Sequence, residues 1–234
     1  MIISLSMNFD KLRQVFHTHW HALFVALVVA LVAGAPQIIV RDALGADDHG
    51  IPMLVNDSEG EYLTRVHEIL DGHWSVASPM LYEYKDSVAL MPPTGEFIFY
   101  ALPVMLTGLP LSTIVVFSKF MYPALLFFLC YLFICSLLNA RDTGARMTAI
   151  AGALLIVLGY DAYDYRNFIR IVLHGAQDQS GLLWNRLVNP ITGALLLFGY
   201  LWLLVLTVRE RVGWRGVAVS GIVLGAMSGY IFSF

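Results

Sequence analysis

Carboxylates are concentrated in one segment of the chain. Eleven of the 17 aspartates and glutamates lie between Arg41 and Glu96, in a loop that separates two strongly apolar segments. Within this acidic loop, Asp57, Glu59 and Glu61 stand at the start of a helical pattern. Charged side chains are costly beside a bilayer, so carboxylates at the mouth of a membrane bundle indicate a chemical site. Such groups can take up a proton or bind a cation.

Cation binding is one chemistry that this loop offers. The candidate ligands for a divalent ion are Asp47, Asp48, His49, His67, Asp71 and His73. His67 and Asp71 are four residues apart and share a face of the expected helix. Carboxylate oxygens suit Mg²⁺, Mn²⁺ or Ca²⁺, so the cofactor prediction is a divalent cation, Mg²⁺ or Mn²⁺. The spacing matches no known metal signature, and a solvated acidic loop explains the same composition.

Composition assigns the chain to a broad class. Hydrophobic residues make up 58 % of it, charged residues 13 %, and the mean hydropathy is +0.70. A soluble domain carries roughly 25 % charged residues, so these values predict a multi-pass membrane protein. A net charge of −3 gives no basic footprint for nucleic acid. Cys130 and Cys135 lie in an apolar segment and are not expected to form a disulfide.

Five membrane-spanning helices are expected, because about 20 apolar residues are needed to cross a bilayer. They are Trp20 to Val40, Leu111 to Leu138, Met147 to Tyr160, Pro190 to Val208, and a fifth that begins near Gly216. The fifth reaches Phe234 with no closing loop, which predicts that the chain is the N-terminal portion of a longer protein or a short variant of one. The fold class is therefore all-α and polytopic, with residues 1–234 forming a single transmembrane domain.

Basic residues predict the orientation of these spans. They form one alternating set of helix ends: Lys11, Arg13, Arg141, Arg146, Arg209, Arg211 and Arg215. The positive-inside rule makes that set cytoplasmic, so the acidic loop (41–96) and a second polar loop (161–189) face outward. The expected location is a bacterial inner membrane, with the N-terminus in the cytoplasm. A cleavable signal peptide ending at Ala33-Gly34-Ala35 is the alternative, against which Pro36 argues.

Two further helices are expected along the membrane surface. Ser58 and Glu61 have capping-box spacing and Gly72 provides a stop, which predicts a helix at Ser58 to Asp71. Phe97 to Leu109 is apolar but too short to cross a bilayer. It is therefore expected to lie at the interface.

These features together resemble the GT-C glycosyltransferases, in particular the bacterial relatives of the protein mannosyltransferases and aminoarabinose transferases. The resemblance covers roughly Trp20 to Leu138. The residues that carry it are Asn56-Asp57-Ser58-Glu59-Gly60-Glu61-Tyr62, Arg65, Ile69-Leu70-Asp71-Gly72-His73-Trp74, Tyr82-Glu83-Tyr84-Lys85-Asp86 and Pro92-Pro93-Thr94-Gly95-Glu96. Weaker support comes from Trp184-Asn185-Arg186-Leu187-Val188-Asn189-Pro190.

The resemblance implies transfer of a sugar from a polyprenyl-phosphate carrier in the bilayer to an acceptor on the outer face. By its place in the motif, Asp57 matches the catalytic aspartate, and Glu59 is the nearest second carboxylate. The arginines expected to hold the lipid phosphate are Arg65, Arg170 and Arg186. Lys119, in the second span, either extends to the outer interface or meets the carrier phosphate.

Other readings of the same residues stay open. In these readings Asp57 only begins a helix, and Glu59 and Glu61 only complement the dipole of that helix. Arg65 only pairs with Glu61. His17, His19 and His21 are expected to lie among lipid headgroups. At the level of the whole chain, the alternatives are a multi-pass transporter and a non-catalytic scaffold or fragment.

Overall fold

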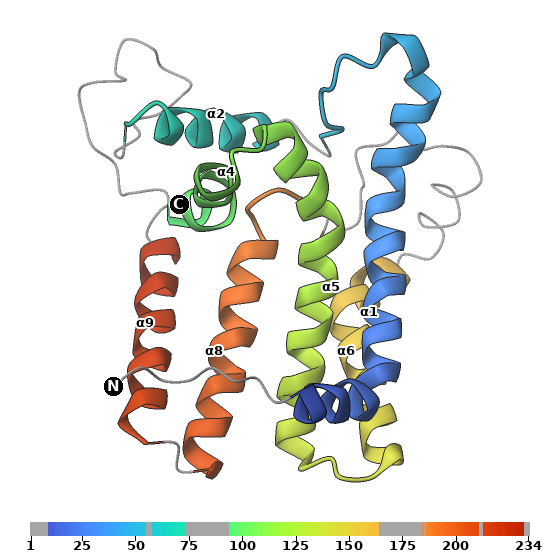
Figure 1. The fold of residues 1–234 in the computed structure, drawn as a ribbon, viewed down its shortest axis with the longest axis vertical. Helices are drawn as coiled ribbons and strands as arrows, with labels where there is room; N and C mark the ends of the chain where they lie inside the picture. The colour runs from blue at the N-terminus through green and yellow to red at the C-terminus, as the bar shows by residue number, and fades with distance from the viewer. Residues whose placement is uncertain are drawn as a thin grey trace.

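A computed structural model of the chain describes residues 9–54, 58–73, 94–163, 184, 186–210 and 213–231. These ranges contain helices and no strand, so the all-α prediction is confirmed. Five long helices run up and down beside one another (Figure 1). They are α1 (Phe9–Leu44), α5 (Leu111–Leu138), α6 (Thr143–Tyr163), α8 (Ile191–Glu210) and α9 (Trp214–Ile231).

Hydropathy marks the described bundle as a membrane protein. Three helical stretches are long and apolar enough to cross a bilayer, Phe16–Asp47, Leu111–Leu138 and Ile191–Arg209. Shorter apolar stretches, Thr143–Gly159 and Gly216–Met227, lie in α6 and α9. Large apolar side chains such as Leu155 and Ile222 are each 72 % exposed on the bundle surface. An apolar outer surface of this kind suits contact with lipid.

Helix α5 is the centre of the bundle. It packs against α1, α6 and α8, and α8 packs in turn against α9. The α5 side chains Leu126, Phe127 and Tyr131 are buried in this core. Cys130 is also buried there, and both it and Cys135 are free thiols, as predicted. Because three helices pack around α5, its position is well fixed, and its end nearest α2 can support other segments.

Small residues in α1 allow α5 to approach closely. A Cβ atom added at Gly34 would lie 2.1 Å from the ring of Phe120, so only glycine fits there. Helix α1 continues through Ala33-Gly34-Ala35 and past Pro36 without a break. The small residues that resemble a cleavage site thus have a packing role, as small residues commonly do between membrane helices.

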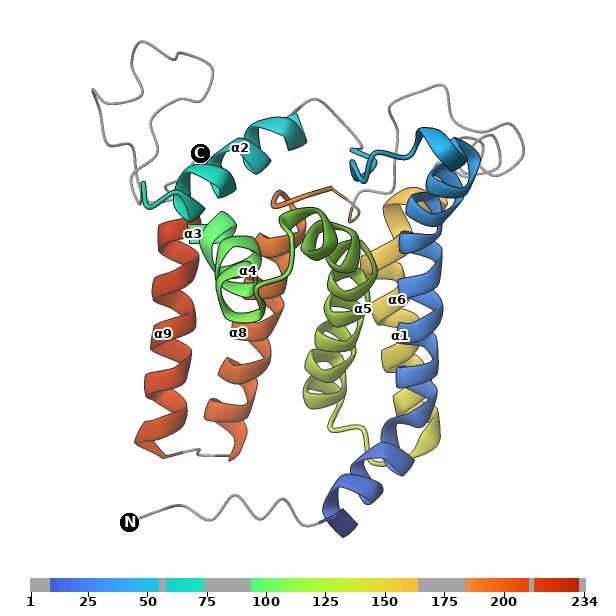
Figure 2. The same ribbon diagram turned by 45° about the horizontal axis from the view of Figure 1, so that its top comes forward.

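Two shorter helical segments lie across one end of the bundle (Figure 2). The first is α2 (Ser58–Leu70), which ends one residue before the predicted end. The second runs without a break through α3 (Thr94–Glu96), η3 (Phe97–Ala101) and α4 (Leu102–Thr107). It begins three residues earlier than predicted, and Gly108 closes it with φ at 68°. Contacts of α2 with η3 and of α3 with α9 hold this layer in place.

Pro103 shapes the second surface segment. A proline has no N–H, so it cannot donate to the carbonyl four residues earlier, which here belongs to Phe99. The segment Phe97–Ala101 is π-helical, and the Tyr122 hydroxyl of α5 donates a hydrogen bond to the Phe99 carbonyl. A side chain of the central helix thus satisfies the group that proline leaves open, and fixes the segment on α5.

Basic residues gather at the end of the bundle opposite α2. Arg141 and Arg146 lie at the α5–α6 connection, and Arg209 lies in the last turn of α8. The α5–α6 connection and the last turn of α8 both lie at the end where α1 begins (Figure 1). Arg211 is outside the described residues. The alternation predicted from sequence is present in the described helices, and the assignment of that end to the cytoplasm stays a prediction.

Candidate functional site

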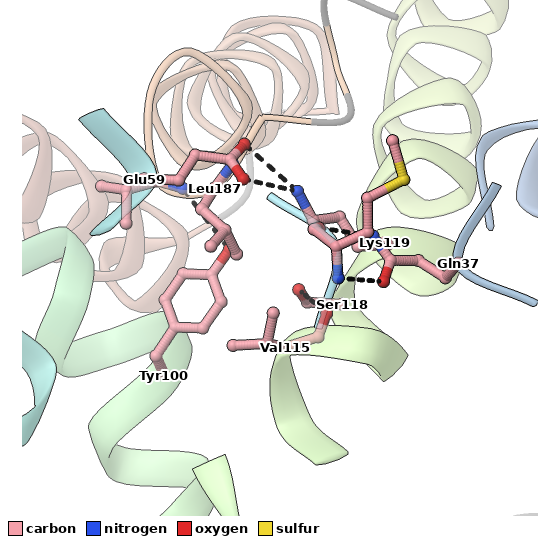
Figure 3. Close-up of polar contacts among 9 residues, drawn as sticks. Gln37, Glu59, Tyr100, Val115, Ser118, Lys119 and Leu187 are labelled. Atoms are coloured by element: carbon pink, nitrogen blue, oxygen red, sulfur yellow. Dashed lines mark hydrogen bonds and ion pairs between the residues drawn. The ribbon is translucent and has the colours of Figure 1, made fainter. Parts of the chain in front are cut away.

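A buried ion pair lies beneath the start of α2. The Lys119 Nζ atom is 3.2 Å from each carboxylate oxygen of Glu59 (Figure 3). The two side chains are only 2 % and 1 % exposed. Charges removed from water in this way persist only when they are paired and hydrogen-bonded. We therefore expect the geometry of this pair to be strongly specified.

Glu59 also joins a third segment to this pair. Its Oε1 atom accepts a hydrogen bond from the backbone N–H of Leu187 at 2.9 Å. Glu59 belongs to the first turn of α2, Lys119 to the third turn of α5, and Leu187 to the segment before α8. One carboxylate thus connects three segments that are far apart in the sequence. Its described contacts give Glu59 a positioning role.

The segment before α8 has an unusual backbone at this point. Val188 has φ at 55°, in the left-handed region that a β-branched residue rarely adopts. Its N–H donates to the Tyr100 hydroxyl at 3.4 Å, and its carbonyl accepts a 2.6 Å bond from the Thr192 hydroxyl. Burial raises the pKa of Tyr100. Strained residues that their surroundings hold in place are often found at functional sites.

A second group of charges, the Arg65 cluster, consists of Arg65, Glu61 and Glu96. Arg65 donates to Glu61 at 2.6 Å and lies 3.5 Å from Glu96. Glu96 is 3 % exposed, and burial raises its pKa although Arg65 acts in the opposite direction. The guanidinium carbon is also 5.9 Å from the centre of the Tyr62 ring. With a side chain 23 % exposed, Arg65 has limited access to a ligand from solvent.

Tyr62 links the Arg65 cluster to the segment before α8. Burial raises the pKa of its hydroxyl, which also takes part in a hydrogen bond with Asn189. Two nitrogens in the same segment, Arg186 Nε and Trp184 Nε1, are buried without a hydrogen-bond partner among the described residues. Buried donors are rarely left unsatisfied. A ligand with acceptor oxygens, such as a phosphate, would supply what these nitrogens need.

The structure describes some of the predicted site residues and not others. Asp57 and Arg170 lie outside the described residues. Glu59 and Lys119 are brought together, and the Lys119 amine pairs with the Glu59 carboxylate beneath the start of α2. Catalysis by Glu59 and phosphate binding by Arg65, Arg186 and Lys119 stay predictions.

Three contributors were not predicted as site residues, although two of them lie in segments that carry the family resemblance. They are Tyr100, Glu96 and the Leu187 N–H. Glu96 could have been found as the last carboxylate of the acidic loop, since it directly precedes an apolar segment. Nothing in the sequence marks the Leu187 N–H, which any residue other than proline would supply.

The candidate metal ligands are not gathered together. Among the described residues, no three His, Cys, Asp or Glu side chains form a group that could hold an ion. Asp48 instead pairs with Arg41 at 2.6 Å and accepts the Gly50 N–H at 2.9 Å, which lowers its pKa. His73 pairs with Glu68 at 2.8 Å. Asp47 follows α1, while His67 and Asp71 belong to α2 and the turn after it. The divalent-cation requirement stays a prediction.

Comparisons with protein-family models, curated proteins and solved structures find no match to this chain.

Proposed function

We propose that this protein transfers a sugar from a polyprenyl-phosphate carrier to an acceptor at the membrane surface, as a GT-C-like glycosyltransferase. The observation that supports this most is the hydrogen bond between Glu59 and the Leu187 N–H. Asp57 precedes Glu59 by two residues, and Arg186 precedes Leu187 by one. The contact therefore joins the segment that carries the proposed base to the segment that carries a proposed phosphate ligand.

The chemistry assigns a separate role to each group. The acceptor hydroxyl oxygen forms a bond to the anomeric carbon, while the bond from that carbon to the phosphate oxygen breaks. The polyprenyl phosphate leaves with the bonding electron pair, and Asp57 takes the hydroxyl proton. Arginine stabilises the phosphate as its negative charge grows, because a guanidinium can donate two parallel hydrogen bonds to its oxygens.

Arg186 is the better described candidate for the phosphate ligand. Its Nε is buried and without a partner among the described residues, whereas Arg65 is already bound to Glu61. In this proposal Arg65 holds α2 against α3 through Glu61 and Glu96. The basic residues at the opposite end of the bundle support a reaction on the outer face, and the membrane in this proposal is a bacterial inner membrane.

Cross-linking of the carrier tests this proposal. The purified full chain in detergent is irradiated with a photoreactive polyprenyl-phosphate hexose, and labelling of Arg186→Gln is compared with wild type. A charge-assisted hydrogen bond is worth ~1.5–3 kcal/mol, so we expect labelling to be at least about tenfold weaker. Arg209→Gln is the matched control, because Arg209 lies at the opposite end and donates to the Ser136 carbonyl. Equal labelling of Arg186→Gln and wild type would refute the role of Arg186.

A further inference from the structure

A polar pocket lies at the end of the bundle opposite α2. Its volume is about 140 Å³, and it opens between the start of α1, the last turns of α5 and the start of α6. The polar side chains that line it include His17, His19, His21, Tyr131 and Arg146. The pocket therefore has room for several waters or for a small anionic group.

Two of its contacts fix the pocket walls. His19 Nδ1 and the Tyr131 hydroxyl are 2.8 Å apart, which joins α1 to α5. Arg146 of α6 donates to the Thr18 carbonyl at 3.4 Å and to the Arg141 carbonyl at 3.0 Å. These partners are neutral carbonyls, so the charge of the guanidinium is not neutralised by them. A positive charge is therefore built into the pocket wall.

The nearby carboxylate of Asp142 does not line the pocket. Asp142 Oδ1 accepts a 2.8 Å hydrogen bond from the Ala145 N–H at the start of α6. The lining instead combines an arginine, which only donates, with imidazole and phenol groups that can donate. This donor-rich set is suited to an anion with several oxygens.

We propose that this pocket binds a phosphate group, with Arg146 as the charged ligand and His19 and Tyr131 as hydrogen-bonding partners. The apolar span of α1 begins at Phe16, so the pocket lies where that helix enters the lipid headgroups. The phosphate could belong to an anionic lipid or be free in solution. The inference does not depend on the proposed glycosyltransferase activity, which concerns the opposite end of the bundle.

Two binding measurements on the purified full chain distinguish the sources. Native mass spectrometry measures retention of phosphatidylglycerol, and ³¹P line broadening measures binding of inorganic phosphate. Arg146→Gln is compared with Arg146→Lys, which keeps the charge, and with Arg209→Gln, which removes a charge at the same end of the bundle. We expect Arg146→Gln to weaken binding about tenfold, the loss of one charge-assisted hydrogen bond, and Arg209→Gln to change it less than about twofold.

The pattern of binding decides the outcome. Binding of phosphatidylglycerol alone, sensitive to Arg146→Gln, identifies a lipid headgroup site, and sensitive binding of inorganic phosphate identifies a site for free phosphate. Tyr131→Phe keeps the ring and should weaken the same binding about threefold, as expected for the loss of one neutral hydrogen bond. Equal losses in Arg146→Gln and Arg209→Gln would overturn the proposal, and so would wild-type protein that binds neither probe.

Discussion

Glu59 and Lys119 form an ion pair although 60 residues separate them in the sequence, and both side chains are almost fully buried. The pair fixes the first turn of α2 on the central helix α5. Because Glu59 also accepts the Leu187 N–H, the same carboxylate sets the position of the segment before α8. A single side chain therefore contacts three segments of the proposed site.

Removal of one partner should be more damaging than removal of both charges. Lys119→Met leaves Glu59 buried without its cation, which should cost about 3–5 kcal/mol in the free energy of unfolding. In Lys119→Met/Glu59→Gln no charge is buried, and the glutamine carbonyl can still accept the Leu187 N–H. We expect the double variant to recover most of the loss, as measured by denaturant unfolding in mixed micelles. Additive losses would show that the two residues do not interact.

The Tyr122 hydroxyl should stabilise the surface segment in a way that depends on Pro103. Tyr122→Phe leaves the Phe99 carbonyl without its side-chain donor, at a cost of about 1–3 kcal/mol. Pro103→Ala restores a backbone N–H that can reach the same carbonyl. In the Pro103→Ala background, Tyr122→Phe should therefore cost less. Equal costs in the two backgrounds, measured by the same unfolding assay, would contradict the role assigned to Pro103.

Close contact between α1 and α5 makes Gly34 intolerant of a side chain. Gly34→Ala places a methyl group against the Phe120 ring, and overpacking of this kind costs about 1–3 kcal/mol. Gly199→Ala is the control, because no atom lies within 4 Å of the position its Cβ would take. We expect a lower thermal midpoint for Gly34→Ala only. A midpoint equal to that of wild type would show that α1 and α5 do not approach so closely.

Glu96 should make stability depend on pH. Its pKa in the folded protein is raised above an ordinary value of 4.5, chiefly by burial. A raised carboxyl pKa means that the folded state binds the proton more tightly, so this contribution is full below the ordinary value and is lost as pH rises through the raised one. Glu96→Gln should flatten the decline in stability above pH 4.5. Identical pH profiles for Glu96→Gln and wild type would contradict this assignment.

Sequence patterns predicted the elements better than the contacts between them. Length and hydropathy located α5 with the same ends that the structure gives, Leu111 and Leu138, and the stop signal placed the end of α2 within one residue. Lys119 was recognised as unusual because a cation inside an apolar span is costly. Its partner was not recognised, because no local rule connects residues 60 apart in the sequence.

In the candidate site, too, a contact within one helix was predicted and contacts between segments were not. Glu61 and Arg65 were predicted to pair from their spacing of four residues, and they do. The third member of that cluster, Glu96, reaches it only through the packing of α3 beside α2. The Tyr122 contact likewise requires that α5 lie beneath the second surface segment and that this segment be π-helical. The periodicity of the sequence indicates neither feature.

Sugar transfer by membranes that contain the full chain tests the central claim most directly. Radiolabelled polyprenyl-phosphate sugars are supplied, and Asp57→Asn is compared with wild type and with Asp142→Asn, a control at the start of α6 whose side-chain oxygen can still accept the Ala145 N–H. A general base contributes about 10²–10⁴-fold, so Asp57→Asn should transfer at least about a hundredfold more slowly, while Asp142→Asn should match wild type. Equal transfer by Asp57→Asn and wild type, or no transfer by wild type, would contradict the account.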